Sequence, residues 1–150
     1  MQLPEALEAA QTAVALDPNA AYGYYAMALA ELPLRRCEQA IAHIKHAFAL
    51  SPRDPIGGLW HMELGVGELC LGRPEAAIAE FERAIDVGYR TSLPYVFLAA
   101  AEAAKGDDAE AQLALAEARR LNPQFTIRLF TAPPPPIIMD GSRKAGLSEE

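Results

Sequence analysis

A pattern of small residues that recurs along the chain restricts its fold more than any other feature. Four segments share an alanine, a side chain of variable size four positions on, and a second alanine three positions further. The closing alanines are Ala13, Ala47, Ala84 and Ala118, so the pattern recurs about every 34 residues, with a slightly longer middle interval. Residues four and seven apart lie on one face of an α-helix, and a face of alanines lets another helix approach closely. The pattern predicts helical units stacked side by side.

Breaks between the segments indicate where the helices end. Pro18, Pro52 and Pro123 follow three of the segments, and proline cannot continue a helix. Valine, isoleucine and threonine are sparse, which argues against a large sheet. We therefore predict an all-α fold with helices over residues 3–16, 20–32, 37–50, 57–71, 74–86, 92–105 and 107–121.

The repeat resembles that of the tetratricopeptide-repeat (TPR) family, in which W-x2-L-G-x2-Y, then A-x3-F, A and P recur about every 34 residues. Leu64-Gly65 and Ala77-x3-Phe81 match this pattern, and Trp60 lies one residue early for its aromatic position. In place of the motif's tyrosine the chain has Glu31, Glu68 and Glu102. The resemblance implies a right-handed α-solenoid of antiparallel helix pairs, with about three full repeats after an N-terminal half repeat.

The predicted organisation is one repeat domain followed by a tail. The repeat domain covers residues 1–130, and 131–150 form a Pro-rich, largely irregular tail. Within the domain we expect a half repeat over 1–19, full repeats over 20–54, 58–91 and 92–125, and a short cap over 126–130. We also expect the apolar segment 137–139 to dock into the concave face of the solenoid.

A narrower resemblance involves residues 51–55, 121–127 and 143–147. These runs are similar to the TPR region of bacterial proteins that also carry a class III adenylate/guanylate cyclase domain or a winged-helix domain. The resemblance implies two alternatives to a free-standing binding module. One is a regulatory segment of a nucleotide cyclase-like enzyme, and the other is a sensory segment of a winged-helix transcription regulator.

Charge and cysteine content bear on partners and location. The chain has 13 basic and 20 acidic residues, a net charge of -7. This balance disfavours nucleic acid and anionic membrane surfaces as partners. We interpret Cys37 and Cys70 as small core or turn residues in a reducing compartment. Since residues 1–5 lack the pattern of a signal peptide, we predict a cytoplasmic protein.

No motif in the sequence supports catalysis or metal binding. His43 and His46 have a spacing that can hold a metal, but no further ligand completes the set, and a solvated helix face explains them better. Gly65-Val66-Gly67 lies within a predicted helix, where close helix approach explains it better than a phosphate loop. We predict no catalytic residue, no metal and no cofactor, hence no enzyme activity.

The resemblance places the functional surface on the first helix of each pair, which lines the concave groove of TPR solenoids. The groove here lacks the Lys and Asn residues with which chaperone-binding TPR proteins clamp a carboxylate, so an apolar helix or extended segment of a protein partner is expected. The alternative is that these residues pack against one another or against a terminal helix. The predicted groove residues are Tyr22, Tyr25, Leu29, Leu32, Leu59, Met62, Val66, Leu69, Leu93, Val96 and Ala100.

The first predicted helix has no preceding partner helix. Its apolar residues Leu7 and Val14 therefore suggest self-association through the N-terminal helix.

Overall fold

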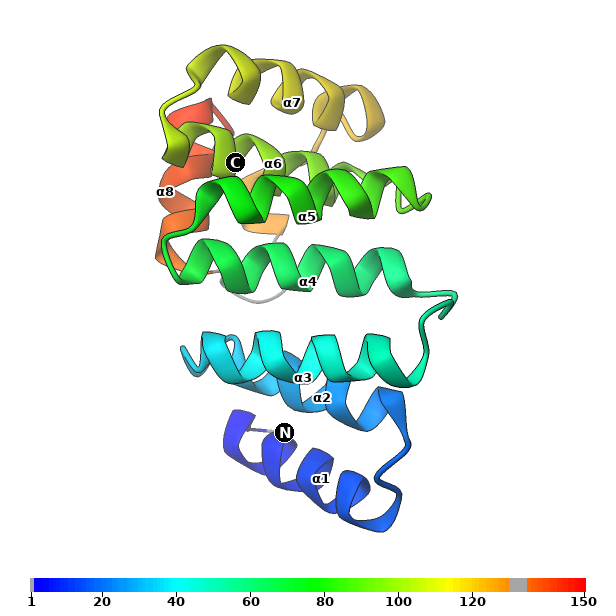
Figure 1. The fold of residues 1–150 in the computed structure, drawn as a ribbon. Helices are drawn as coiled ribbons and strands as arrows, with labels where there is room; N and C mark the ends of the chain where they lie inside the picture. Colours follow the sequence, from blue (N-terminus) through cyan, green and yellow to red (C-terminus); the bar gives the residue numbers. More distant parts are fainter. Residues whose placement is uncertain (1, 130–134) are drawn as a thin grey trace.

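The computed structural model describes residues 2–129 and 135–150, and within these ranges the chain is helical with no strand (Figure 1). This confirms the all-α prediction, and each predicted helix up to residue 121 agrees with the structure to within one residue at either end. The helices are α1 (Leu3–Leu16), α2 (Ala21–Glu31), α3 (Cys37–Leu50), α4 (Gly57–Cys70), α5 (Pro74–Asp86), α6 (Ser92–Lys105), α7 (Asp108–Leu121), the short 3-10 helix η1 (Ile127–Leu129) and α8 (Pro136–Ala145).

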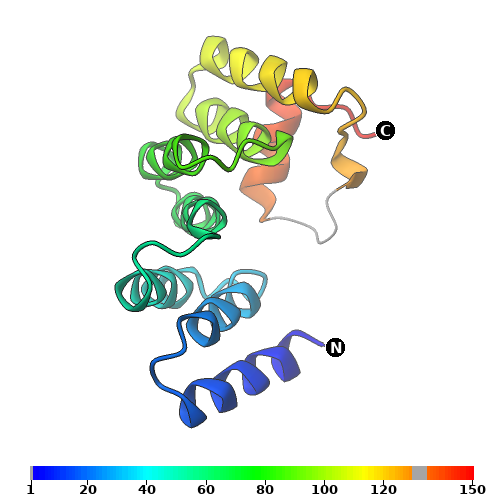
Figure 2. The same cartoon turned by 90° about the vertical axis from the view of Figure 1, so that its right-hand side faces the viewer.

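Helices α2 to α7 form three antiparallel pairs that stack along one axis, and α1 packs beside α2 as a single helix. Figure 2 looks along the helices of the stack. The second helices α3 and α5 lie on the outer side, and the first helices α2, α4 and α6 lie on the side that faces α8. We call the surface formed by α2, α4 and α6 the inner face.

The alanine pattern carries the contacts within each pair. All six alanines of the second to fourth segments are fully buried: Ala40, Ala47, Ala77, Ala84, Ala111 and Ala118. In the first segment Ala10 is buried and Ala6 is half-buried against α2, whereas Ala13 is exposed. Leu7 and Val14, which the sequence suggested for self-association, instead pack toward α2. Self-association through α1 stays a prediction, and the buried Leu7 offers little surface for it.

Two glycines of α4 allow the close helix approach that the sequence predicted. A Cβ atom at Gly65 would collide with the ring of Phe81 on α5, and one at Gly67 would come within 2.7 Å of Ile41 on α3. Phe81 is fully buried and cannot move aside without disturbing the core.

The same turn follows α2, α4 and α6. Five residues after each of Glu31, Glu68 and Glu102, a backbone N–H donates to the carbonyl of that glutamate at 2.9–3.0 Å. This bond needs a left-handed residue just before the donor. Gly72 and Gly106 supply it in two repeats, with φ of 72° and 98°, but the first repeat uses Arg35, with φ of 62°.

We expect Arg35→Gly to stabilise the protein by up to about 1 kcal/mol. A side chain in the left-handed region costs roughly 1–2 kcal/mol, and glycine's greater freedom in the unfolded chain offsets part of the gain. Urea denaturation followed by far-UV circular dichroism measures the change. Gly72→Ala is the matched control and should destabilise by a similar amount. A less stable Arg35→Gly variant would contradict this account of the turn.

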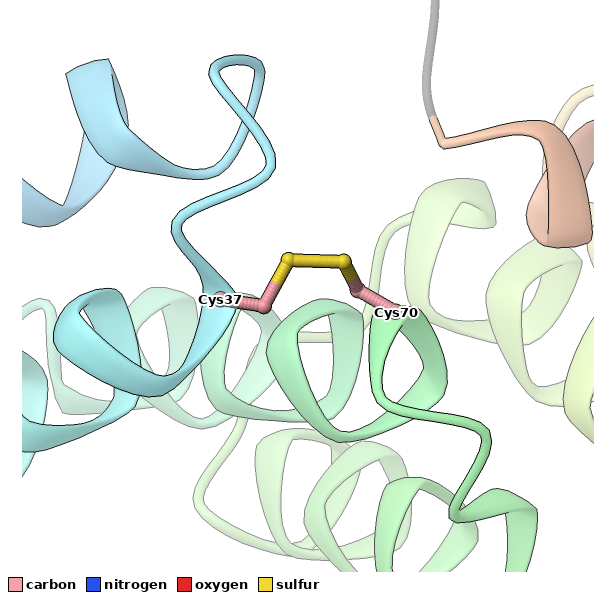
Figure 3. Close-up of a disulfide and its surroundings, with 2 residues drawn as sticks. All are labelled: Cys37 and Cys70. Atoms are coloured by element: carbon pink, nitrogen blue, oxygen red, sulfur yellow. A yellow bond between two sulfur atoms is a disulfide. The ribbon is translucent and has the colours of Figure 1, made fainter.

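Cys37 and Cys70 form a disulfide between the first residue of α3 and the last residue of α4 (Figure 3). The prediction of two separate thiols was therefore wrong. The two helices run antiparallel, so the start of one lies beside the end of the other, and the Cα atoms are 6.3 Å apart. Disulfides persist mainly in oxidising compartments. The cytoplasmic location thus stays a prediction, and the cysteines no longer support it.

The C-terminal segment is more ordered than the sequence suggested. η1 falls within the predicted cap, and residue 130 lies outside the described residues. We predicted a largely irregular tail, but residues 136–145 form α8. Proline is tolerated in the first turn of a helix, and Gly146, in the left-handed conformation, ends α8. Burial supplies the stability that local propensity lacks, since Ile138 is fully buried.

α8 lies across α6 on the inner face (Figures 1 and 2). Gly141 brings the two helices together, because a Cβ atom there would lie 2.5 Å from the carbonyl oxygen of Ala100. Lys144 Nζ donates to the carbonyl oxygen of Ala103 at 3.0 Å. The expected docking of segment 137–139 on the concave face thus takes the form of a helix, with Ile138 as its buried residue.

Candidate functional site

The accessible apolar part of the inner face begins on α2. Tyr22 and Leu29 are 54% and 41% exposed, and Ala26 is exposed between them. These positions are four and three residues apart, so they share one face of the helix. The result is an apolar stripe two turns long that no described segment covers.

Tyr22 is held in place from two sides. Its hydroxyl donates to Asp54 Oδ1 at 3.0 Å, and its ring meets Trp60 edge-on with the centroids 6.0 Å apart. The hydrogen bond to Asp54 raises the pKa of Tyr22, so the hydroxyl stays protonated as the donor. Trp60 is fully buried and also packs against Tyr25 and Phe48. The exposed ring therefore rests on a rigid aromatic base.

A small pocket of about 180 Å³ opens at the start of α4. It lies between the α3–α4 and α5–α6 loops, with Ile56 and Leu59 on one side and Val87 and Tyr89 on the other. Its lining is mainly apolar. Such a pocket is large enough for one aliphatic side chain of a partner.

Glu63 is half-buried and lies one turn beyond Leu59 on the same face of α4. Burial raises the pKa of its carboxyl to about 7. Burial, followed by the negative charge of Glu63, raises the pKa of Tyr25 on α2, so the two side chains are electrostatic neighbours. The groove predicted from the sequence omitted Glu63 because only apolar positions were chosen. Its spacing, four residues after Leu59 and three before Val66, would have placed it there.

The structure divides the eleven predicted groove residues into two groups. Tyr22, Leu29, Leu59 and Leu93 keep accessible surface. The other seven are buried, which is the alternative that the sequence left open: Tyr25, Leu32, Met62, Val66, Leu69, Val96 and Ala100. α8 packs on α6 and shares a core with Val96 and Ala100. We call the remaining open part, made of Tyr22, Ala26, Leu29, Leu59 and Glu63, the α2–α4 surface.

His43 and His46, whose spacing could hold a metal, contact other side chains instead. His43 Nδ1 lies 2.7 Å from Glu31, and the ring of His46 packs on Tyr24 with centroids 4.3 Å apart. Among the described residues no group of three His, Cys, Asp or Glu side chains is placed to hold a metal. In the same part of the chain, no helix is long and apolar enough to cross a bilayer.

Comparison with solved structures identifies the fold as a TPR solenoid. The crystal structure of TTC0263, a thermophilic TPR protein of Thermus thermophilus, superposes with a TM-score of 0.71 at 26% identity. That alignment covers 81% of this chain but only 66% of TTC0263. Two crystal structures of MamA superpose with TM-scores of 0.70 and 0.73 at 22% and 19% identity. They cover 87% and 95% of this chain and 68% and 86% of MamA, and at these identities they show the fold alone.

No family model and no curated protein matches the sequence. The resemblance to the TPR regions of cyclase-like and winged-helix proteins is not confirmed by these comparisons. A cyclase-linked or a transcription-linked role stays a prediction.

Proposed function

We propose that this chain is a non-catalytic protein-interaction module that binds an apolar peptide or helix of a partner protein on the α2–α4 surface. The exposed stripe of Tyr22, Ala26 and Leu29 is the observation that carries the proposal. Apolar side chains on one helix face cost free energy when they meet water, and a partner's apolar side chains would bury them.

Preorganisation of the surface supports the same proposal. Asp54 and Trp60 hold the ring of Tyr22 before any partner arrives. Since Tyr22 is already restricted, binding loses little side-chain entropy there. Exposed tyrosines on rigid supports are typical of binding hot spots.

Leu29→Gln tests the site. Short peptides are first selected from a random displayed library against the full chain, and their dissociation constants are measured by fluorescence anisotropy. We expect the substitution to weaken them about tenfold or more, because burying one leucine contributes roughly 1.5–3 kcal/mol.

Leu113→Gln provides the matched control. Leu113 is 64% exposed on α7, away from the inner face, and its substitution should leave binding unchanged. Equal affinities of both variants and the unsubstituted chain would show that the peptides bind elsewhere and would end the proposal for this surface.

A further inference from the structure

We propose that the partner segment carries a lysine or arginine that pairs with Glu63, next to an apolar side chain that enters the pocket beside Leu59. This inference rests on the proposed function, because it names the chemistry of the partner that the α2–α4 surface accepts.

Glu63 differs from the other acidic residues of the inner helices in having no hydrogen-bond or ion-pair partner among the described residues. α2, α4 and α6 contain four glutamates. Glu31 pairs with His43, Glu68 with Arg73 at 3.4 Å and Glu102 with Lys105 at 3.8 Å. No hydrogen bond or ion pair to Glu63 exists within the described part of the chain.

An unpaired carboxylate in a largely apolar wall is costly for the free protein. Burial disfavours the charged form of Glu63, and the charge of Glu63 adds to burial in raising the pKa of Tyr25. A cation brought by a partner would compensate that cost. Because the carboxylate of Glu63 gains a cation only in the complex, a basic partner should bind more tightly than a neutral one.

The surroundings of Glu63 offer the rest of the contact. The pocket lined by Ile56, Leu59 and Tyr89 is one helical turn away, and the stripe of Tyr22 and Leu29 lies on the neighbouring inner helix. The three inner helices contain a single lysine, Lys105, at the far end of α6, and no arginine. A segment that combines apolar and basic side chains would therefore meet complementary groups.

α8 shows that the inner face binds a helix of this composition. It buries Ile138 against the core and directs Lys144 to the carbonyl oxygen of Ala103 and, at 3.5 Å, to Asp108. Arg143 and Lys144 make its last turn basic. α8 covers the part of the inner face formed by α6. The α2–α4 surface continues the same face, and there Glu63 is still unpaired.

Three synthetic helical peptides of equal length test the inference. They share the same leucine and alanine positions and differ only in carrying lysine, glutamine or glutamate at the polar positions. We expect the lysine peptide to bind the full chain at least tenfold more tightly than the glutamine peptide, and the glutamate peptide to bind more weakly than both. Isothermal titration calorimetry at pH 8, where Glu63 is charged, measures all three.

Glu63→Gln should reduce the ratio between the lysine and glutamine peptides to less than threefold. Glu82→Gln removes the same charge from an exposed position on α5, an outer helix, and should leave the ratio above sevenfold. This control separates a contact with Glu63 from general attraction to an acidic protein.

The outcomes distinguish the two proposals. If the lysine and glutamine peptides bind equally, or if both variants change the ratio alike, the pairing with Glu63 is wrong while binding at the surface stands. If Leu29→Gln weakens neither peptide, or if neither binds, the proposed function is wrong and the inference falls with it.

Discussion

Reduction of the Cys37–Cys70 disulfide is expected to lower the free energy of unfolding by about 3–4 kcal/mol. The bond closes a loop with a sequence separation of 33, and a cross-link over such a loop restricts the unfolded chain by roughly this amount. It also joins α3 to α4, which share less contact than any other neighbouring pair from α1 to α7. Urea denaturation with and without dithiothreitol measures the loss.

The double variant Cys37→Ala, Cys70→Ala separates this effect from other actions of the reductant. Its stability should resemble that of the reduced protein and should not respond to dithiothreitol. An unchanged denaturation midpoint when the native protein is fully reduced, as verified by thiol titration, would show that the bond contributes nothing to stability.

Glu63 should make the folded state less stable as the pH rises from about 4.5 to 7. Its pKa is raised from 4.5 to about 7, so the folded protein holds a proton that the unfolded chain releases. The stability from this proton is fully present below pH 4.5 and is lost as the pH passes through 7. The loss is on the order of 3 kcal/mol at most.

Glu63→Gln isolates this contribution, because an amide of similar shape does not titrate. The variant and the native protein should be about equally stable near pH 4, and the variant should be the more stable of the two by pH 8. Burial and the charge of Glu63 raise the pKa of Tyr25, so Tyr25 stays protonated over this pH range and does not distort the comparison. Urea denaturation at a series of pH values gives the free energy of unfolding of both proteins. If the two proteins show the same dependence on pH, the pKa of Glu63 is not raised in the folded state.

The repeat and its helices could be predicted from sequence because their signals are local. The alanine spacing defines one helix face, and most turns carry their own proline or glycine. The Schellman-type turn at Arg35 has no such signal, since an arginine rarely adopts positive φ. It follows the geometry of the equivalent turns at Gly72 and Gly106.

The disulfide, α8 and Glu63 depend on contacts between distant parts of the chain. Cys37 and Cys70 meet only once α3 and α4 are antiparallel, which the repeat implies but the two cysteines alone do not. α8 follows a proline run and gains its helix from packing on α6 through Gly141. Packing between neighbouring helices, together with α8 on α6, leaves only four of the eleven predicted groove residues accessible.

The number of neighbours that each helix has determines where the stack opens most easily. In a linear array each internal helix is stabilised by a neighbour on both sides, whereas a terminal helix has only one. Among the described residues α1 packs mainly on α2, while α8 packs on α6 at the other end of the stack. In the described chain, local opening should therefore cost least free energy at α1. The Cys37–Cys70 disulfide, which joins α3 to α4, should limit how far that opening spreads along the stack.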